Sequence, residues 1–169
     1  MKKRPGANIL DVLKVIKTRA IDPGFHCGAN ESPWMQLVPG TWNKYTLFDL
    51  PNNAYVNLFK INPGCSLAPH YHCQPVIGYV IQGKWKYKEY DWVAGPGSTV
   101  YESAGTVHTL MNVGKVPMIS VFHVTGPSID VDENGRQVCY ADAFSLRQVV
   151  RNYCKAHGID ASFLKKITR

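Results

Sequence analysis

The chain has 169 residues, 45% of them hydrophobic and 18% charged, so it is long and apolar enough to bury the core of one globular domain. This composition excludes an intrinsically disordered polypeptide. The formal net charge of +7 raises the question of a nucleic-acid or membrane partner, which only the position of the charges can answer.

Apolar periodicity predicts a helix at the start of the chain and short strands after it. Residues 8–20 are predicted to form a short amphipathic helix, because their apolar side chains share one helical face. A loop rich in Pro, Gly and Asn follows as far as residue 33. From residue 34 to about residue 138, short apolar runs alternate with turn residues, which is typical of strands. Strands are expected at residues 54–60, 79–82, 84–90, 98–102, 107–113 and 118–125.

The end of the chain is predicted to form a hairpin and then helices. Asn134-Gly135 has the composition of a hairpin turn. Asp142 is a candidate cap for a helix that runs to His157 and ends at Gly158, and a second short helix is expected at residues 160–167. This order of elements favours a mainly β sandwich or barrel with helical ends.

We therefore expect one compact unit with three parts. Residues 1–33 form an N-terminal helix and loop arm, residues 34–140 form the β-barrel, and residues 141–169 form a helical extension packed on the same domain.

The positive charge lies at the two ends of the chain. Residues 1–20 and residues 146–169 each carry +5, whereas residues 21–145 carry −3. A nucleic-acid groove needs basic residues spread over a binding face, and the middle of the chain has no such pattern. We expect no nucleic-acid partner.

Membrane insertion and secretion are not expected. No apolar run approaches the roughly 20 residues of a membrane span. Asp11, Lys14 and Lys17 interrupt the apolar stretch that a secretory signal would need. The five cysteines are odd in number and form no C-x-x-C motif, which favours a reducing compartment. A cytoplasmic protein with no membrane partner is the expectation.

Three histidines have the spacing of a metal site. His70 and His72 form an H-x-H pair, and alternate residues of a strand point to the same face. His108 lies on another predicted strand, after Gly105-Thr106. Three neutral imidazoles from adjacent strands suit Fe, Zn, Cu or Ni. An isolated H-x-H pair is often incidental, so the third histidine carries the prediction.

The spacing around these histidines resembles the two motifs of the cupin superfamily. The first motif matches Gly64, His70, His72 and Gly83, and the second matches Gly97, Ser103, Gly105, His108 and Asn112. Ser103 replaces the usual Pro, and Val76-Ile77 stand where the first motif normally has Glu. The resemblance implies a single cupin fold, a double-stranded β-helix or jelly-roll barrel whose metal ligands point inward.

Most of residues 33–169 also resembles the 2,4'-dihydroxyacetophenone dioxygenase family. The distinctive segments are GYVIQGKWKYKEYDW and E-x-x-G-x-x-H-T-L. The resemblance implies Fe(II) held by His70, His72 and His108, with Zn, Ni, Cu or Mn as alternative metals. It also implies O2 and a small aromatic hydroxyketone as substrates, and a role in aromatic compound catabolism. The type reaction yields 4-hydroxybenzoate and formate. Acetylacetone-cleaving cupins, which take β-diketones, are similar in chemistry.

Glu102, six residues before His108, is the candidate catalytic carboxylate. In three-histidine dioxygenases a Glu at this offset acts near the metal, and the resemblance carries that role to Glu102. It would hydrogen-bond a ligating histidine or a metal-bound water. The alternative is a solvated charge at the end of a strand.

A substrate pocket could include Trp85, Tyr87 and Glu89, which share one strand face by alternation. The two rings could clamp an aromatic substrate, although a W-x-Y pair is more often part of the core. Glu89 could instead belong to a solvated, salt-bridged surface with its neighbouring lysines. His123, in an apolar run, is expected to be a buried, hydrogen-bonded histidine rather than a fourth ligand.

The sequence thus predicts a non-haem Fe(II) dioxygenase that cleaves a C–C bond next to a ketone carbonyl. The alternatives are a β-diketone-cleaving or other metal-dependent cupin enzyme, and a cupin that senses a metal or ligand without turnover. For the sensor, the basic helical ends could bind a partner. By analogy with other cupins, we expect a homodimer or homotetramer.

Overall fold

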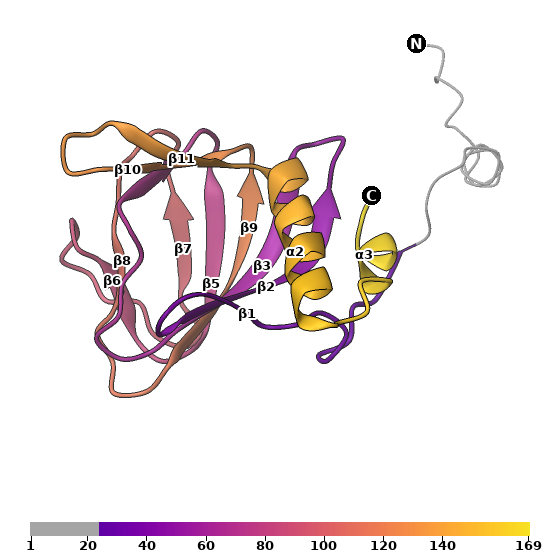
Figure 1. Ribbon diagram of the computed structural model, residues 1–169. Coiled ribbons are helices and arrows are strands. Elements are labelled where there is room, and N and C mark those ends of the chain that lie inside the picture. Colours follow the sequence, from indigo (N-terminus) through magenta and orange to yellow (C-terminus); the bar gives the residue numbers. More distant parts are fainter. Residues whose placement is uncertain (1–23) are drawn as a thin grey trace, which may run out of the picture.

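The computed structural model describes residues 24–169 as two facing layers of β-strands with helices at one end (Figure 1). The larger layer is a six-stranded sheet in the order β1-β2-β3-β9-β5-β7. Its strands are β1 (Met35–Val38), β2 (Thr41–Asp49), β3 (Ala54–Ile61), β9 (Met118–Thr125), β5 (Val76–Gln82) and β7 (Thr99–Glu102). This mainly β, cupin-like architecture confirms the predicted fold class.

The second layer is built from two smaller sheets. One has the order β11-β10-β4 and the other pairs β6 with β8. Their strands are β4 (His70–His72), β6 (Trp85–Tyr87), β8 (Leu110–Asn112), β10 (Ser128–Val131) and β11 (Gln137–Ala141). Isolated bridges between Ser66 and Met111 and between His70 and His108 join the two sheets into one wall. The predicted hairpin at Asn134-Gly135 is confirmed as the turn between β10 and β11.

Side-chain alternation decides which residues line the interior. On β9, the even-numbered positions from Met118 to Val124 are buried. His123 therefore points outward and is exposed, so the expectation of a buried histidine was wrong. The strand expected at residues 107–113 is reduced to β8, and His108 lies just before it, in the bridge to His70.

The core between the layers is closed by aromatic side chains. Trp85 has no exposed surface, and its indole Nε1 donates to Ser120 Oγ at 2.9 Å across the layers. Tyr87 lies beside it, with ring centroids 5.2 Å apart. Trp85 therefore ties the small sheet to the large one, as the core interpretation of the W-x-Y pair predicts.

Most ends of the two helices after the barrel lie where the sequence predicts them. The helix α2 (Ala143–His157) begins after Asp142 and ends at Gly158, whose φ of 65° is the left-handed conformation that glycine adopts most readily. Asp142 and Ser145 form a capping box. The helix α3 (Phe163–Lys166) is shorter than the predicted 160–167.

The two helices pack on the barrel. Val150 and Cys154 of α2 belong to the same buried core as the strands, and α2 lies beside β2 (Figure 1). The final residues pair with β2, where Phe48 N donates to Ile167 O at 2.7 Å. The predicted helix at residues 8–20 lies outside the described residues, and the division at residues 33 and 140 stays a prediction. Among the described helices, none is long and apolar enough to cross a membrane.

We predict that Asp142→Ala destabilises the protein by about 1 kcal/mol, because it removes the side chain that accepts from Ser145 N at the start of α2. Urea unfolding followed by circular dichroism measures the change. Glu133→Ala, in the exposed β10–β11 turn, is the control and is expected to have no measurable effect. Equal midpoints for all three proteins would contradict the role given to this cap.

Candidate metal centre

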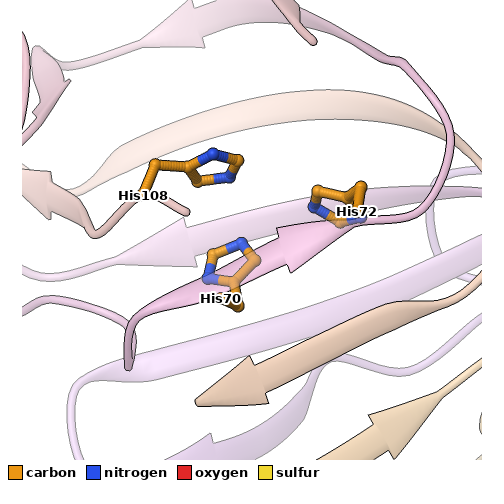
Figure 2. Close-up of side chains that lie close together, drawn as sticks. All are labelled: His70, His72 and His108. Carbon is orange, nitrogen blue, oxygen red and sulfur yellow. The ribbon is translucent and has the colours of Figure 1, made fainter. Parts of the chain in front are cut away.

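The three predicted histidines meet on the inner side of the second layer. His70 and His72 lie on β4, and the backbone of His108 pairs with that of His70 through two hydrogen bonds of 2.9 and 3.1 Å. The ring centroid of His70 is 5.3 Å from that of His72 and 4.7 Å from that of His108. Figure 2 shows the three rings converging from two segments of the chain. These residues form what we call the histidine cluster.

The free nitrogens of the cluster fit a metal ion. His70 Nδ1 donates to Ala68 O at 2.9 Å, which leaves Nε2 free to act as a ligand. His72 Nδ1 and His108 Nε2 are buried and have no hydrogen-bond partner within residues 24–169. One ligand nitrogen from each ring lies within 4.8 Å of the others. Three imidazoles with ligand nitrogens at this spacing, two of them carrying an unpaired buried nitrogen, fit a metal ion.

Burial keeps two of these rings neutral. Burial, with a smaller contribution from the neighbouring imidazoles, lowers the pKa of His72 to about 3 and that of His108 to about 4. A neutral imidazole has a lone pair to offer, whereas a protonated one repels a cation. The site is therefore ready for a metal at neutral pH without first losing protons from these two rings.

Glu102 reaches the cluster from β7 in the facing sheet. Its Oε2 lies 3.4 Å from both His72 Nε2 and His108 Nε2, and the side chain is nearly fully buried. Because both rings are neutral, these contacts are not ion pairs, and Oε2 has no hydrogen-bond partner in the described chain. A cation beside the rings would satisfy the carboxylate and the imidazoles together.

Tyr87 holds the other oxygen of Glu102. The Tyr87 hydroxyl donates to Glu102 Oε1, and the tyrosine ring packs on His108 with centroids 4.2 Å apart. Burial and the nearby carboxylate keep the pKa of Tyr87 well above its usual value, so its hydroxyl stays protonated and able to donate. Burial raises the pKa of Glu102 to about 7, although the bond from Tyr87 opposes this shift.

A cavity of about 190 Å³ opens beside the cluster, between the two layers. His70, His72, Tyr87 and Glu102 line one part of it. The apolar side chains on its walls are Leu37, Phe59, Leu67, Val76, Leu110, Phe122, Val124 and Leu146. A second hollow of about 210 Å³ also touches Tyr87 and Glu102, and His108, Tyr90 and Trp92 are among the residues that line it.

The other predicted pocket residues do not join Tyr87 in these cavities. Trp85 is fully buried in the core. Glu89 is exposed, and its Oε2 accepts a hydrogen bond from Thr109 N at 2.9 Å. Its carboxylate forms no ion pair with the described lysines, in contrast to the salt-bridged surface considered from the sequence. In the described part of the chain, therefore, neither Trp85 nor Glu89 lines either cavity.

The sequence analysis missed a polar group on the cavity wall that faces the cluster. Asn43 and Tyr45 of β2 and Asn57 of β3 all line the cavity and are almost fully buried. For Asn57 the available signal was an amide within the mostly apolar run Ala54–Ile61, since a buried strand rarely carries a polar residue without a reason.

We predict that His108→Ala removes the metal, since it takes one of three ligands from the site. Metal analysis of the purified protein is expected to fall from about one ion per chain to a small fraction of that. His123→Ala, on the outward face of β9, is the matched control and is expected to keep the wild-type content. Full metal retention by the His108 variant would refute the assignment of this ligand.

We predict that Glu102→Gln changes the pH dependence of stability in the chelator-treated protein. The pKa of about 7 in the folded protein exceeds the usual 4.5 of a Glu side chain, so the carboxyl favours folding fully below pH 4.5 and loses this contribution as the pH rises to 7. Relative to the Gln variant, the wild type should lose up to about 3 kcal/mol over this window.

Unfolding by urea at several pH values measures this difference. Glu133→Gln serves as the control, because an exposed carboxyl should leave the curve unchanged. A pH-independent difference between the wild type and the Glu102 variant would contradict the raised pKa.

Comparison with known proteins assigns the family. The model of the ChrR cupin-like domain matches residues 23–128. An RmlC-like cupin protein from Ralstonia eutropha JMP134 is 33% identical, with a TM-score of 0.77, and the match covers 83% of this chain and 94% of that one. Acetylacetone dioxygenase from Acinetobacter johnsonii is 16% identical, with a TM-score of 0.69 over 79% of this chain and 94% of that one.

The three comparisons differ in what they establish. At 16% identity the dioxygenase shares the fold and supports nothing more by itself. No curated protein sequence gave a match. The family model spans more than half of the chain and includes all three histidines of the cluster. This protein therefore belongs to the ChrR cupin-like family of the cupin superfamily.

Proposed function

We propose that this protein is a metal-dependent dioxygenase that cleaves a C–C bond next to a ketone carbonyl. The observation that carries the proposal is the meeting of three imidazoles, two of them held neutral by burial, and one buried carboxylate beside a small, mostly apolar cavity. The acetylacetone dioxygenase of Acinetobacter johnsonii has the same fold, so this fold can house a dioxygenase.

In this proposal, His70, His72 and His108 hold Fe(II), with Zn, Ni, Cu and Mn as alternatives. The bound ion would polarise the ketone oxygen of the substrate and supply the chemistry with O2. The imidazoles add no charge, so a divalent ion keeps more of its positive charge than it would with a carboxylate in the ligand set. That charge favours a substrate that binds as an anion.

The chain's own residues bind the substrate and move a proton. The apolar walls exclude water and hold the carbon skeleton of a small aromatic hydroxyketone, as in the conversion of 2,4'-dihydroxyacetophenone to 4-hydroxybenzoate and formate, or of a β-diketone. Glu102 Oε2 takes the proton that the substrate loses, because this buried oxygen lies beside His72 and His108 and has no hydrogen-bond partner in the described chain. Tyr87 keeps Oε2 aimed at the cluster by binding Oε1.

A second candidate function is metal or ligand sensing without turnover. Membership of the ChrR cupin-like family favours it, because such cupins can be non-catalytic. In that case the same cluster and cavity would bind a ligand and change the affinity for a partner. A homodimer or homotetramer stays a prediction for either function.

Oxygen consumption separates the two functions. We predict that the iron-loaded protein takes up O2 with at least one member of a panel of 2-hydroxyacetophenones and β-diketones. Glu102→Gln should keep its iron and lose about a hundredfold or more in kcat, since it removes the proposed base. Glu133→Gln is the control with an unchanged rate. If the iron-loaded wild type consumes no O2 with any compound, the dioxygenase proposal fails and the sensor remains.

A further inference from the structure

Asp130 places a second carboxylate on the wall of the cavity. It lies on β10, where it pairs directly with His70 of β4. Residues that lie opposite each other in an antiparallel pair point to the same face, with Cβ atoms about 4.5–5.5 Å apart. The side chain of Asp130 therefore lies beside the histidine cluster, and it is one of the residues that line the cavity.

The carboxylate of Asp130 faces the large sheet across the cavity. The pKa of Tyr55 on β3, which also lines the cavity, is raised above its usual value, mainly by burial. The negative charges of Glu102 and Asp130 add to this shift. Unlike its buried neighbours on β10, Asp130 keeps part of its surface accessible. A ligand in the cavity therefore meets this charge.

No other group of the described chain neutralises this charge. Within residues 24–169 the carboxylate of Asp130 forms no ion pair. Asp132, two residues further along the same hairpin, shows the structural use of an aspartate. Its Oδ1 accepts hydrogen bonds from Asn134 N at 2.9 Å and from Arg136 N at 2.8 Å, which hold the turn. Asp130 has no such bond in the described chain, so its charge is left for whatever occupies the cavity.

The cavity has two carboxyl groups and no basic counterpart. Glu102 reaches it from the large sheet, and neither Lys nor Arg is among the described residues that line it. The imidazoles of His72 and His108 stay neutral. An anionic group that enters is repelled by these carboxylates, and the repulsion is stronger than in bulk water because the apolar walls lower the local dielectric constant.

We propose that Asp130 is a specificity residue that keeps anionic ligands out of the cavity and helps acidic products to leave. The inference rests on the proposed function and adds a requirement on its substrate, which must enter uncharged. A neutral ketone that gives its proton to Glu102 leaves the total charge of the site unchanged. A carboxylate adds one more negative charge.

The proposed reaction turns a neutral ligand into acids. When the bond between the ketone carbon and a hydroxymethyl carbon breaks, each of the two carbons takes one oxygen atom of O2. The carbons are oxidised, O2 is reduced, and two carboxylic acids result without any other reductant. At neutral pH each acid gives its proton to water and becomes an anion. The products therefore meet a repulsion from Asp130 that the substrate does not.

Equilibrium binding tests the inference without turnover. Isothermal titration into the full-length zinc-loaded and metal-free proteins compares acetophenone, a neutral ketone, with benzoate, an anion of nearly the same shape. Asp130→Asn should bind benzoate about tenfold more tightly than the wild type and acetophenone within about twofold of it. Asp130→Ser also removes the charge and should behave alike if the Asn variant fails to fold. An unchanged affinity for benzoate, or an equal gain for both ligands, would overturn the proposal.

Glu133→Gln is the matched control, because it removes the same charge from the exposed turn of the same hairpin. It should leave both affinities unchanged. A gain in benzoate affinity equal to that of the Asp130 variants would assign the effect to the net charge of the protein and would overturn the role of the cavity.

The outcome is separate from the test of the dioxygenase. If the Asp130 variant gains affinity for benzoate but the iron-loaded wild type takes up no O2, the selection by charge stands and the reaction is refuted. If the wild type takes up O2 but the variant gains no affinity for benzoate, the reaction stands and the role of Asp130 is refuted.

Discussion

The candidate site depends on one antiparallel pair of residues. The backbones of His70 and His108 exchange two hydrogen bonds, which join β4 to the segment that leads into β8. Because His72 follows two positions later on β4, its side chain lies on the same face as His70. This single pairing completes the second wall of the barrel and gathers three imidazoles from two parts of the chain. A shift of one residue would turn the ligands away from the interior.

Burial then determines the electrostatics of the cluster. It disfavours charge on His72 and His108, which lowers their pKa values, and it disfavours charge on Glu102, which raises the pKa of that carboxyl. His72 and His108 therefore stay neutral and able to bind a cation, and a cation beside them would stabilise the charged form of Glu102. The Tyr87 hydroxyl orients Glu102 by donating to its Oε1, and the Tyr87 ring packs on the ring of His108. The same desolvation thus acts on the candidate ligands and on the proposed base.

Much of this could be predicted from local patterns. Turn residues and apolar alternation marked most strands, and Asp142 and Gly158 bound α2 as expected. The spacing of His70, His72 and His108 was sufficient to predict that they meet. The exposure of His123 was missed, since an apolar run does not state which of its faces is inward. Glu89 was placed near the pocket because the sequence could not show that β6 ends at Tyr87.

By itself, the sequence determined the mainly β fold, the helix ends and the residues able to hold a metal, because these depend on local propensity and motif spacing. Only the tertiary structure decided that Glu102 faces His72 and His108, that Trp85 belongs to the core, and that Asn57 donates to Asn43 on the sheet that faces the histidine cluster. Each of these depends on which strands lie opposite one another across the barrel. The net charge of +7 did not point to the candidate metal centre, since it is built from buried groups whose chemistry is set by their neighbours.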